Sequence, residues 1–302
     1  MSANSLLSNC YVPLPYNNLK KKTTINPSSR PSGGDKKRNS KSIRHLCIDR
    51  HVLSNSTGSS LIELGHTKVL CNVHGPRPIS SHNGNVSVAK GVLNCQVRFA
   101  PHFGVKPETK IMTAATNLDG FANTSSSSNN AQETELSSRL NDCIAPSVPL
   151  HLLMKNVVDV FVMVLQDDGA IFPACVIAAS LALADSGVET YGLVTAFSVA
   201  VIPKQVVMNV GGDNDVSMDD DEEDNTGISK SDSNLYILAD PNAKETLLAE
   251  AVLTVAMMKS WKEVVFWDQT GSLPPSVANE AGELCQEGCV AMHKFMRQAL
   301  VG

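Results

Sequence analysis

One stretch of apolar residues constrains the fold of this chain more than any other feature. Residues 157–165 are an almost unbroken run of valine and other apolar side chains, a pattern typical of a strand buried on both faces. The run leads to the turn sequence Asp167-Asp168-Gly169 and then to residues 172–186, which predict a helix that is apolar nearly all round and capped by Gly187. A buried strand followed by a buried helix predicts a domain with both elements at its centre.

Shorter apolar segments predict the remaining elements. Strands are expected at 59–64, 67–74, 92–99, 193–202, 235–239, 253–258 and 263–267. Gly65-His66 is the expected hairpin turn between the first two strands, and Gly75-Pro76 is expected to end the second. Helices are expected at 136–145 and 275–300, and the later helix should bury a stripe made of Val277, Ala281, Leu284, Cys285, Met292, Phe295 and Ala299. Without a GxGxxG or P-loop motif, this pattern indicates an α+β (mixed α/β) fold.

Three segments of biased composition interrupt the compact pattern. Ten lysines and arginines lie between Lys20 and Arg50, and residues 23–42 are rich in Ser, Pro and Gly. We interpret residues 1–42 as a flexible basic extension that either contacts phosphate or nucleic acid or is a solvated tail or nuclear-import signal. Residues 122–132 are rich in Ser and Asn, and residues 210–232 include eight acids between Asp213 and Asp224. Both are expected to be disordered insertions in a single domain over 43–302.

The length of the apolar runs and the spacing of the cysteines limit which class of protein this chain can be. No apolar run is long enough to cross a bilayer and the first residues lack a secretory-signal pattern, so we expect a soluble intracellular protein. The eight cysteines have neither disulfide-like nor paired metal-like spacing. Cys285 and Cys289 would share one helix face, where two buried small side chains are favoured over a metal site. We expect no metal and no other cofactor.

Three motifs, in their order and spacing, resemble RNase PH-type domains. The first covers 58–71 and His74-Gly75-Pro76-Arg77-Pro78, the second covers 164–169 and 178–188, and the third is Asp240-Pro241 followed by 253–256. The resemblance extends over residues 43–300. It implies a ribosomal protein S5 domain 2-like fold with two β-β-β-α-β-α-type halves. It also implies a place in a six-membered ring, which is a homohexamer in bacteria and contains six different RNase PH-like chains in the eukaryotic exosome.

Within this family, the chain most resembles the ring subunit of the mRNA-transport type, through residues 167–169, 188–191 and Asp240-Pro241. The resemblance implies a non-catalytic structural subunit of the exosome core ring. Such a subunit supports assembly and RNA passage in 3′-to-5′ RNA processing and degradation, including rRNA maturation and mRNA turnover. The implied partners are other RNase PH-like subunits, cap subunits with OB and KH folds, and RNA, with no membrane. The implied locations are the nucleus, nucleolus and cytoplasm.

The chain departs from the pattern of active members at two places. Active members hold phosphate with an arginine beside a threonine just before the buried strand, where this chain has Lys155 and Asn156. Lysine cannot reproduce bidentate binding of phosphate by a guanidinium. Active members also have two aspartates six residues apart with an acid between them. Here Asp240 matches the first aspartate and Glu245 the intervening acid, but Thr246 replaces the second aspartate.

These departures predict a degenerate site at Lys155, Asn156, Asp240 and Thr246, with Asp240 as a turn residue. The alternative is an active phosphate-dependent 3′-to-5′ exoribonuclease of the RNase PH type.

Basic side chains in the first half are the candidates for RNA contact. Members of the family present basic loops to RNA there, which points to Arg77, Arg98 and Lys106. Each is equally consistent with an ordinary surface cation in a weak ion pair. The adjacent carboxylates of Asp167 and Asp168 are interpreted as turn residues, because neighbouring side chains on a turn usually diverge.

Overall fold

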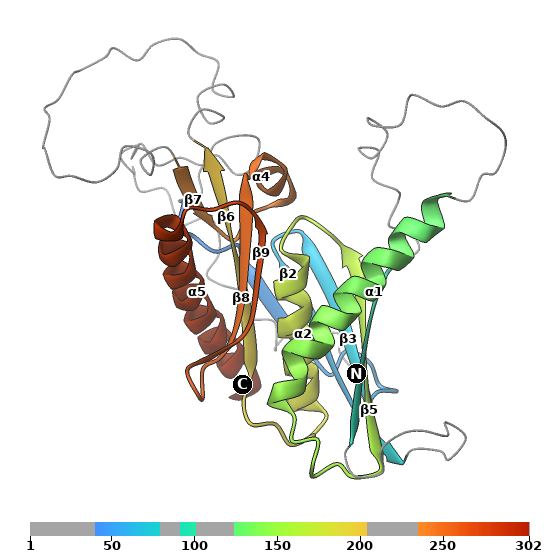
Figure 1. The fold of residues 1–302 in the computed structure, drawn as a ribbon. Helices are drawn as coiled ribbons and strands as arrows, with labels where there is room; N and C mark the ends of the chain where they lie inside the picture. Colours follow the sequence, from blue (N-terminus) through green and yellow to red (C-terminus); the bar gives the residue numbers. More distant parts are fainter. Residues whose placement is uncertain (1–39, 79–90, 101–123, 204–234, 302) are drawn as a thin grey trace, which may run out of the picture.

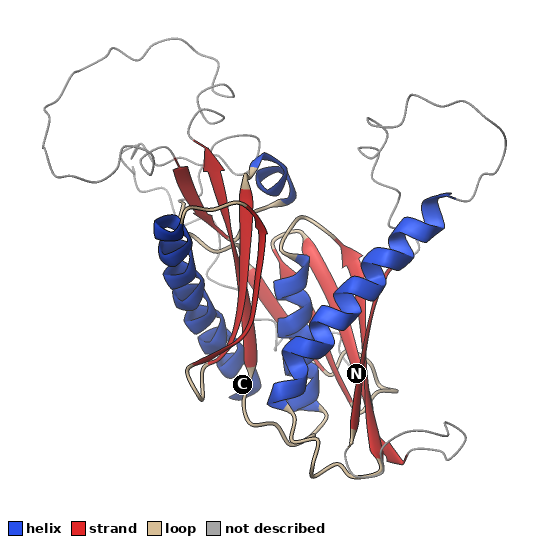
Figure 2. Cartoon of the chain, in the orientation of Figure 1, coloured by secondary structure: helices blue, strands red, loops and turns tan. Residues whose placement is uncertain are grey.

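The computed structural model describes residues 40–78, 91–100, 124–203 and 235–301. These residues form two β-sheets with helices between and outside them, in four layers (Figures 1 and 2). The predicted insertion at 210–232, Lys106 and nearly all of the predicted N-terminal extension lie outside the described residues. In the described ranges, no helix is both long enough and apolar enough to span a membrane.

The first sheet contains five strands in the order β1-β2-β3-β5-β4. They are β1 (Leu46–Arg50), β2 (Gly58–Leu64), β3 (Thr67–Pro78), β4 (Val92–Phe99) and β5 (Asn156–Gln166). Neighbouring strands are antiparallel except for the parallel pair β4 and β5. The helix α1 (Thr124–Ile144) connects these two strands as the crossover that parallel pairing requires.

The second sheet contains four antiparallel strands in the order β7-β6-β8-β9. They are β6 (Val194–Pro203), β7 (Leu235–Ala239), β8 (Ala251–Met258) and β9 (Glu263–Gly271). The long helix α5 (Pro275–Val301) packs on β6 and β8, and the short helix α4 (Ala243–Leu248) follows β7. A single-turn 3₁₀ helix, η4 (Ala145–Ser147), extends α1.

The helix α2 (Ile171–Asp185) lies between the two sheets and contacts β2 and β3 on one side and β6 on the other. Residues 173–183 are all buried, as expected for a helix that is covered all round. Gly187 follows with a φ of +74°, the left-handed conformation typical of the residue after a helix. The predicted buried helix at the centre of the domain is confirmed, and so is the mixed α/β fold. The prediction that β5 is buried on both faces is wrong, because Phe161 and Met163 on its outer face are 37% and 42% exposed.

Two predicted boundaries are wrong. The helix expected at 136–145 begins at Thr124, so the structure assigns most of residues 122–132 to a helix instead of a disordered loop. Once a helix has been nucleated, each added residue contributes a hydrogen bond, so a helix is extended more easily than it is started. The strand β3 continues through Gly75-Pro76 to Pro78. It does so because β5 is long enough to pair with Arg77 and Pro78 beyond an irregularity in the register.

The predicted buried stripe of α5 is mostly confirmed. Val277, Ala281, Cys285 and Met292 are buried, and Leu284 and Ala299 pack partly buried against the core. Phe295 is an exception, with 42% of its surface exposed. The stripe instead continues from Met292 to Met296, four residues on, which leaves Phe295 at its flank.

Two short elements were not predicted. β1 is an edge strand of five residues, and α4 is a helix of six residues. Their presence gives the first half the order β-β-β-β-α-β-α and the second half the order β-β-α-β-β-α. Both halves therefore differ in detail from the expected β-β-β-α-β-α order.

Candidate functional site

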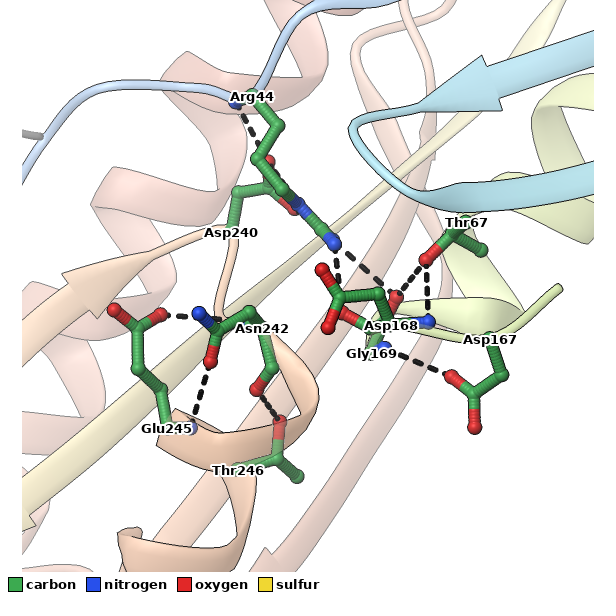
Figure 3. A network of polar contacts seen from close by, with 9 residues as sticks. All are labelled: Arg44, Thr67, Asp167, Asp168, Gly169, Asp240, Asn242, Glu245 and Thr246. Atoms are coloured by element: carbon green, nitrogen blue, oxygen red, sulfur yellow. Dashed lines mark hydrogen bonds and ion pairs between the residues drawn. The ribbon is translucent and has the colours of Figure 1, made fainter. Parts of the chain in front are cut away.

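Asp240 lies just after β7, where its backbone is left-handed with a φ of +51° and its side chain is 2% exposed. Arg44 binds both of its carboxylate oxygens (Figure 3). The backbone N–H and the Nε of Arg44 donate to Oδ2 at 2.8 and 3.0 Å, and Nη2 donates to Oδ1 at 2.7 Å. Charge-assisted pairs of this bidentate kind are among the strong hydrogen bonds of proteins. Asp240 is thus half of a buried ion pair, a role that the sequence did not indicate.

The same guanidinium reaches the turn between β5 and α2. Its Nη1 donates to the carbonyl of Asp168 at 2.8 Å, and its Nη2 donates to the carbonyl of Gly169 at 3.3 Å. Thr67 contacts the other side of this turn: its hydroxyl donates to the Gly169 carbonyl at 2.8 Å and accepts from the N–H of Asp168 at 3.0 Å. These five residues, Arg44, Thr67, Asp168, Gly169 and Asp240, are called the Arg44 cluster below.

The turn itself has the hydrogen bonding that its sequence predicted. The Oδ1 of Asp167 accepts from the N–H of Gly169 at 2.8 Å, an arrangement typical of aspartate in turns. The carbonyl of Asp168 also accepts from the N–H of Ala243 at 3.0 Å. The β5–α2 turn is therefore fixed both internally and to the start of α4.

Asn242, Glu245 and Thr246 form the N-terminus of α4. The Oδ1 of Asn242 accepts from the N–H of Glu245 at 2.8 Å, and the Glu245 carboxylate accepts from the N–H of Asn242 at 2.9 Å. This is a reciprocal capping box. The exposed Thr246 donates its hydroxyl to the carbonyl of Asn242 at 2.8 Å. Glu245 and Thr246, two of the three positions that match the acids of the family motif, therefore bond to their own helix terminus.

Lys155 and Asn156 lie at the other end of β5 from the Arg44 cluster. Lys155 is exposed and left-handed with a φ of +60°, and Asn156 begins the strand. β5 has 11 residues; at a rise of about 3.3 Å per residue, roughly 33 Å separates its two ends. The four positions predicted as one degenerate site therefore occupy two distant places. The sequence could not reveal the separation, because Asp240 and Thr246 follow β7 and are brought to the far end of β5 only by tertiary contacts, such as those of Arg44 with Asp168 and Gly169.

Arg77 and Arg98 are the two predicted RNA-contact residues that the structure describes, and both lie on the outer face of the first sheet. Arg77 pairs with the buried carboxylate of Asp159 at 2.5 Å and keeps 64% of its side chain exposed. Arg98 is exposed on β4 and stands opposite Met163. Arg77 stands opposite Val157, so about six residues of β5, or roughly 20 Å, separate the two arginines. They do not form one compact cluster.

All the described cysteines are buried and unbridged. They are Cys47, Cys71, Cys95, Cys143, Cys175, Cys285 and Cys289. Cys285 donates to the carbonyl of Leu253 at 3.9 Å, and Cys289 donates to that of Val255 at 3.5 Å. This confirms that the pair packs as buried small side chains. Within the described ranges, no group of three or more His, Cys, Asp or Glu side chains is placed to hold a metal ion.

The sequence of residues 42–189 matches the 3′ exoribonuclease family, domain 1, and this range contains the first sheet with α1 and α2. The exosome complex component Rrp41 of Pyrobaculum arsenaticum is 30% identical over 225 residues, which cover 74% of this chain and 76% of that protein. With its two sheets and central helix, the chain belongs to the RNase PH family of 3′ exoribonuclease domains.

Other relatives cover more of the chain. The exosome complex component Rrp41 of Cenarchaeum symbiosum is 26% identical over 257 residues, 85% of this chain and 86% of the relative. The human exosome complex component MTR3 is 28% identical over 271 residues, 86% of this chain and 83% of MTR3. The crystal structure of rice Rrp46 has the same fold, with a TM-score of 0.62 at 17% identity over 87% of this chain and 98% of Rrp46.

Sequence reasoning missed Arg44, which in the sequence is only one of the basic residues between Lys20 and Arg50. Its partner Asp240 is 196 residues away, so no local pattern connects them. The N-terminus of α4 did have a local signal, because Asn242 followed three residues later by Glu245 is the spacing of a capping box.

Proposed function

We propose that this chain is a non-catalytic subunit of the exosome core ring. Relatives that align over more than four-fifths of their length, from an archaeon and from human, are named exosome complex components. The proposal gives the chain a structural role in assembly and in RNA passage during 3′-to-5′ RNA processing and degradation. The proposed partners are other RNase PH-like subunits, cap subunits with OB and KH folds, and RNA, in the nucleus, nucleolus and cytoplasm.

The observation that carries the proposal is the state of Asp240. A carboxylate that serves as a proton acceptor or metal ligand must present a lone pair to the reacting groups. Here Arg44 donates to both oxygens of Asp240, and the side chains of both residues are at most 6% exposed. Removing one partner of a buried ion pair typically costs about 3–5 kcal/mol. A substrate or ion would have to displace Arg44 against a cost of that order.

The remaining positions support the same proposal. Thr246 offers a hydroxyl where a second carboxylate would be needed, and that hydroxyl donates to the carbonyl of Asn242. Lys155 and Asn156 lie roughly 33 Å from the Arg44 cluster, measured along β5. Lys155 and Asn156 therefore do not form one site with Asp240 in this chain.

The test is phosphate-dependent release of nucleoside diphosphate from a 3′-terminal RNA. The full chain is purified alone and together with another RNase PH-like exosome chain. The expected result is no release by the chain alone. If the two chains together release nucleoside diphosphate, this activity should remain in the Thr246→Ala and Lys155→Ala variants of this chain. It should disappear when the acids of the partner chain are mutated. These two substitutions affect exposed side chains, and circular dichroism melting checks that they leave the fold intact.

The alternative, an active phosphorolytic exoribonuclease, makes the opposite prediction. Release by this chain alone that depends on phosphate would overturn the non-catalytic proposal. So would loss of the pair's activity in Asp240→Asn, provided that the variant melts within a few degrees of the parent chain.

A further inference from the structure

Two exposed aromatic side chains meet at the end of the molecule opposite α4. Tyr191 lies in the loop between α2 and β6, and Trp261 lies in the hairpin turn between β8 and β9. Their side chains are 47% and 59% exposed, and their ring centroids are 6.1 Å apart at an interplanar angle of 79°. In this edge-to-face arrangement the two rings together present a large aromatic surface to solvent.

The backbone around these rings is held firmly. The N–H of Tyr191 donates to the carbonyl of Ser147 at 2.8 Å. The hairpin turn is closed by the N–H groups of Trp261 and Lys262, which donate to the carbonyls of Met258 and Lys259 at 3.2 and 3.3 Å. The two loops pack so closely that a Cβ at Gly192 would lie 2.5 Å from the Oγ of Ser260. The aromatic pair is therefore preorganised.

Two lysines lie in the same hairpin turn as Trp261, in a chain whose net charge is −5. Lys259 and Lys262 lie in the hairpin turn itself, and Lys262 is exposed. Burial lowers the pKa of His293 on α5, and the charges of Lys259 and Arg297 lower it further, which places each of these two cations within electrostatic reach of His293. Glu189, in the loop before β6, and Glu263, the first residue of β9, are exposed acids next to these lysines and rings in the sequence.

We infer that Tyr191 and Trp261 form a stacking site for the unpaired bases of single-stranded RNA, with Lys259 and Lys262 contacting its phosphates. Aromatic side chains beside a cationic surface are the usual means of binding single strands without sequence preference. Aromatic residues also favour protein interfaces, but lysine is depleted there, so the two lysines favour RNA. The site is independent of the Arg44 cluster and does not depend on whether the chain is catalytic.

Binding is measured by fluorescence anisotropy of a labelled 12-nucleotide oligouridine, with the full chain in complex with its ring partner and without phosphate. Trp261→Ala and Tyr191→Ala should each weaken binding about tenfold, as expected for the loss of one stacked base. Trp261→Phe should stay within about threefold of the parent, because its ring can still stack. Lys262→Glu should weaken binding and reduce its salt dependence. A 12-base-pair RNA duplex should bind more weakly than the single strand, since its bases are already stacked.

The matched control is Tyr236→Ala, which removes another exposed aromatic side chain, from β7. It should leave RNA affinity within about twofold of the parent, and thermal melting verifies that every variant folds. A second readout uses Trp267→Phe, which leaves Trp261 as the sole tryptophan of a chain that has two. Oligouridine should quench its fluorescence. Unchanged affinity in both alanine variants, or quenching produced only by an added protein subunit, would overturn the inference in favour of a protein interface.

Discussion

At the scale of single residues, the Arg44–Asp240 pair shows how a position from a catalytic motif can be used for structure. Both side chains are removed from water, which is costly for each charge. The cost is offset because the guanidinium also donates to two backbone carbonyls, at Asp168 and Gly169. The pair therefore stabilises the fold only while both partners and these acceptors remain in place.

Arg44→Ala should be strongly destabilising for this reason. It leaves the carboxylate of Asp240 buried without its cation, and we expect the free energy of unfolding to fall by about 3–5 kcal/mol. Urea titration followed by circular dichroism measures the change. Lys41→Ala, an exposed cation of the same segment, is the matched control and should change stability by less than about 0.5 kcal/mol. A loss below about 1 kcal/mol in Arg44→Ala would contradict the assigned role.

The burial of the cysteine thiols leads to a second prediction at this scale, on how stability depends on pH. Burial raises the pKa of Cys175 from its ordinary value of 9.0 to about 12, and the charge of Asp167 adds to the rise. Between these two pKa values the unfolded chain releases a proton that the folded chain keeps. Linkage then requires that stability be retained below pH 9 and fall as pH rises toward 12.

The contribution of Cys175 can be isolated with Cys175→Ala. The variant lacks this proton, so the stability difference between the parent and the variant should shrink by up to about 1.4 kcal/mol per pH unit above pH 9. Urea unfolding at pH 7, 9, 10 and 11 measures the difference. A difference that stays constant over this range would mean that the thiol is not shielded from water as the structure requires.

At the scale of elements, the β5–α2 turn depends on a glycine for two separate reasons. Gly169 has a φ of +85°, a conformation that side chains with a Cβ rarely adopt. A Cβ there would also lie 2.6 to 2.8 Å from the backbone of residues 241–243, at the start of α4. The turn therefore positions α2 and α4 together, with the Arg44 cluster between them.

Gly169→Ala and Gly187→Ala separate these two reasons. Gly187 is also left-handed, with a φ of +74°, but a Cβ there would meet no atom within 4 Å. Gly187→Ala should cost only the backbone strain, about 1–2 kcal/mol. Gly169→Ala should cost roughly 3 kcal/mol or more, because displacing packed backbone adds to that strain. Equal losses in the two variants, measured by thermal melting, would show that the close approach to α4 is unimportant.

At the scale of the whole molecule, the outer face of the first sheet carries a row of partly exposed apolar side chains. Leu61, Leu70 and Met163 stand in register across β2, β3 and β5, and Met163 is 42% exposed. Phe161, next to Met163 on the same face, is 37% exposed. Partly exposed apolar rows and open sheet edges favour association with another chain.

The chain alone should therefore self-associate, and co-expression with an RNase PH-like exosome chain should give a soluble hetero-oligomer. Light scattering coupled to size-exclusion chromatography measures both. Met163→Glu should weaken association because it places a charge in the apolar row, whereas Leu247→Glu, at a 70% exposed position on α4, should not. A stable monomer of the parent chain at all concentrations would contradict this prediction.

The sequence by itself determined the centre of the domain. The valine run of β5 and the all-round apolar pattern of α2 are local signals. Residues on one face of a strand are two positions apart, and residues on one face of a helix are three or four positions apart, so a short stretch of sequence shows which side chains are buried. The same local signals located nearly every other strand and the long closing helix. Local patterns gave a wrong prediction where contacts with a neighbouring element determine the structure. Examples are the extension of β3 along β5 and the exposure of Phe295.

Only the tertiary structure decided the state of the candidate site. Asp240 reads as a possible acid or turn residue until Arg44, 196 residues away, is brought to its carboxylate. Likewise, Lys155 and Asp168 are close in sequence, yet the rigid extended rise of β5 places them at opposite ends of a strand. The aromatic pair of Tyr191 and Trp261 also comes from two loops 70 residues apart. Contacts between residues so far apart in the sequence depend on how the sheets and helices pack. The periodicity of apolar residues along the chain does not predict them.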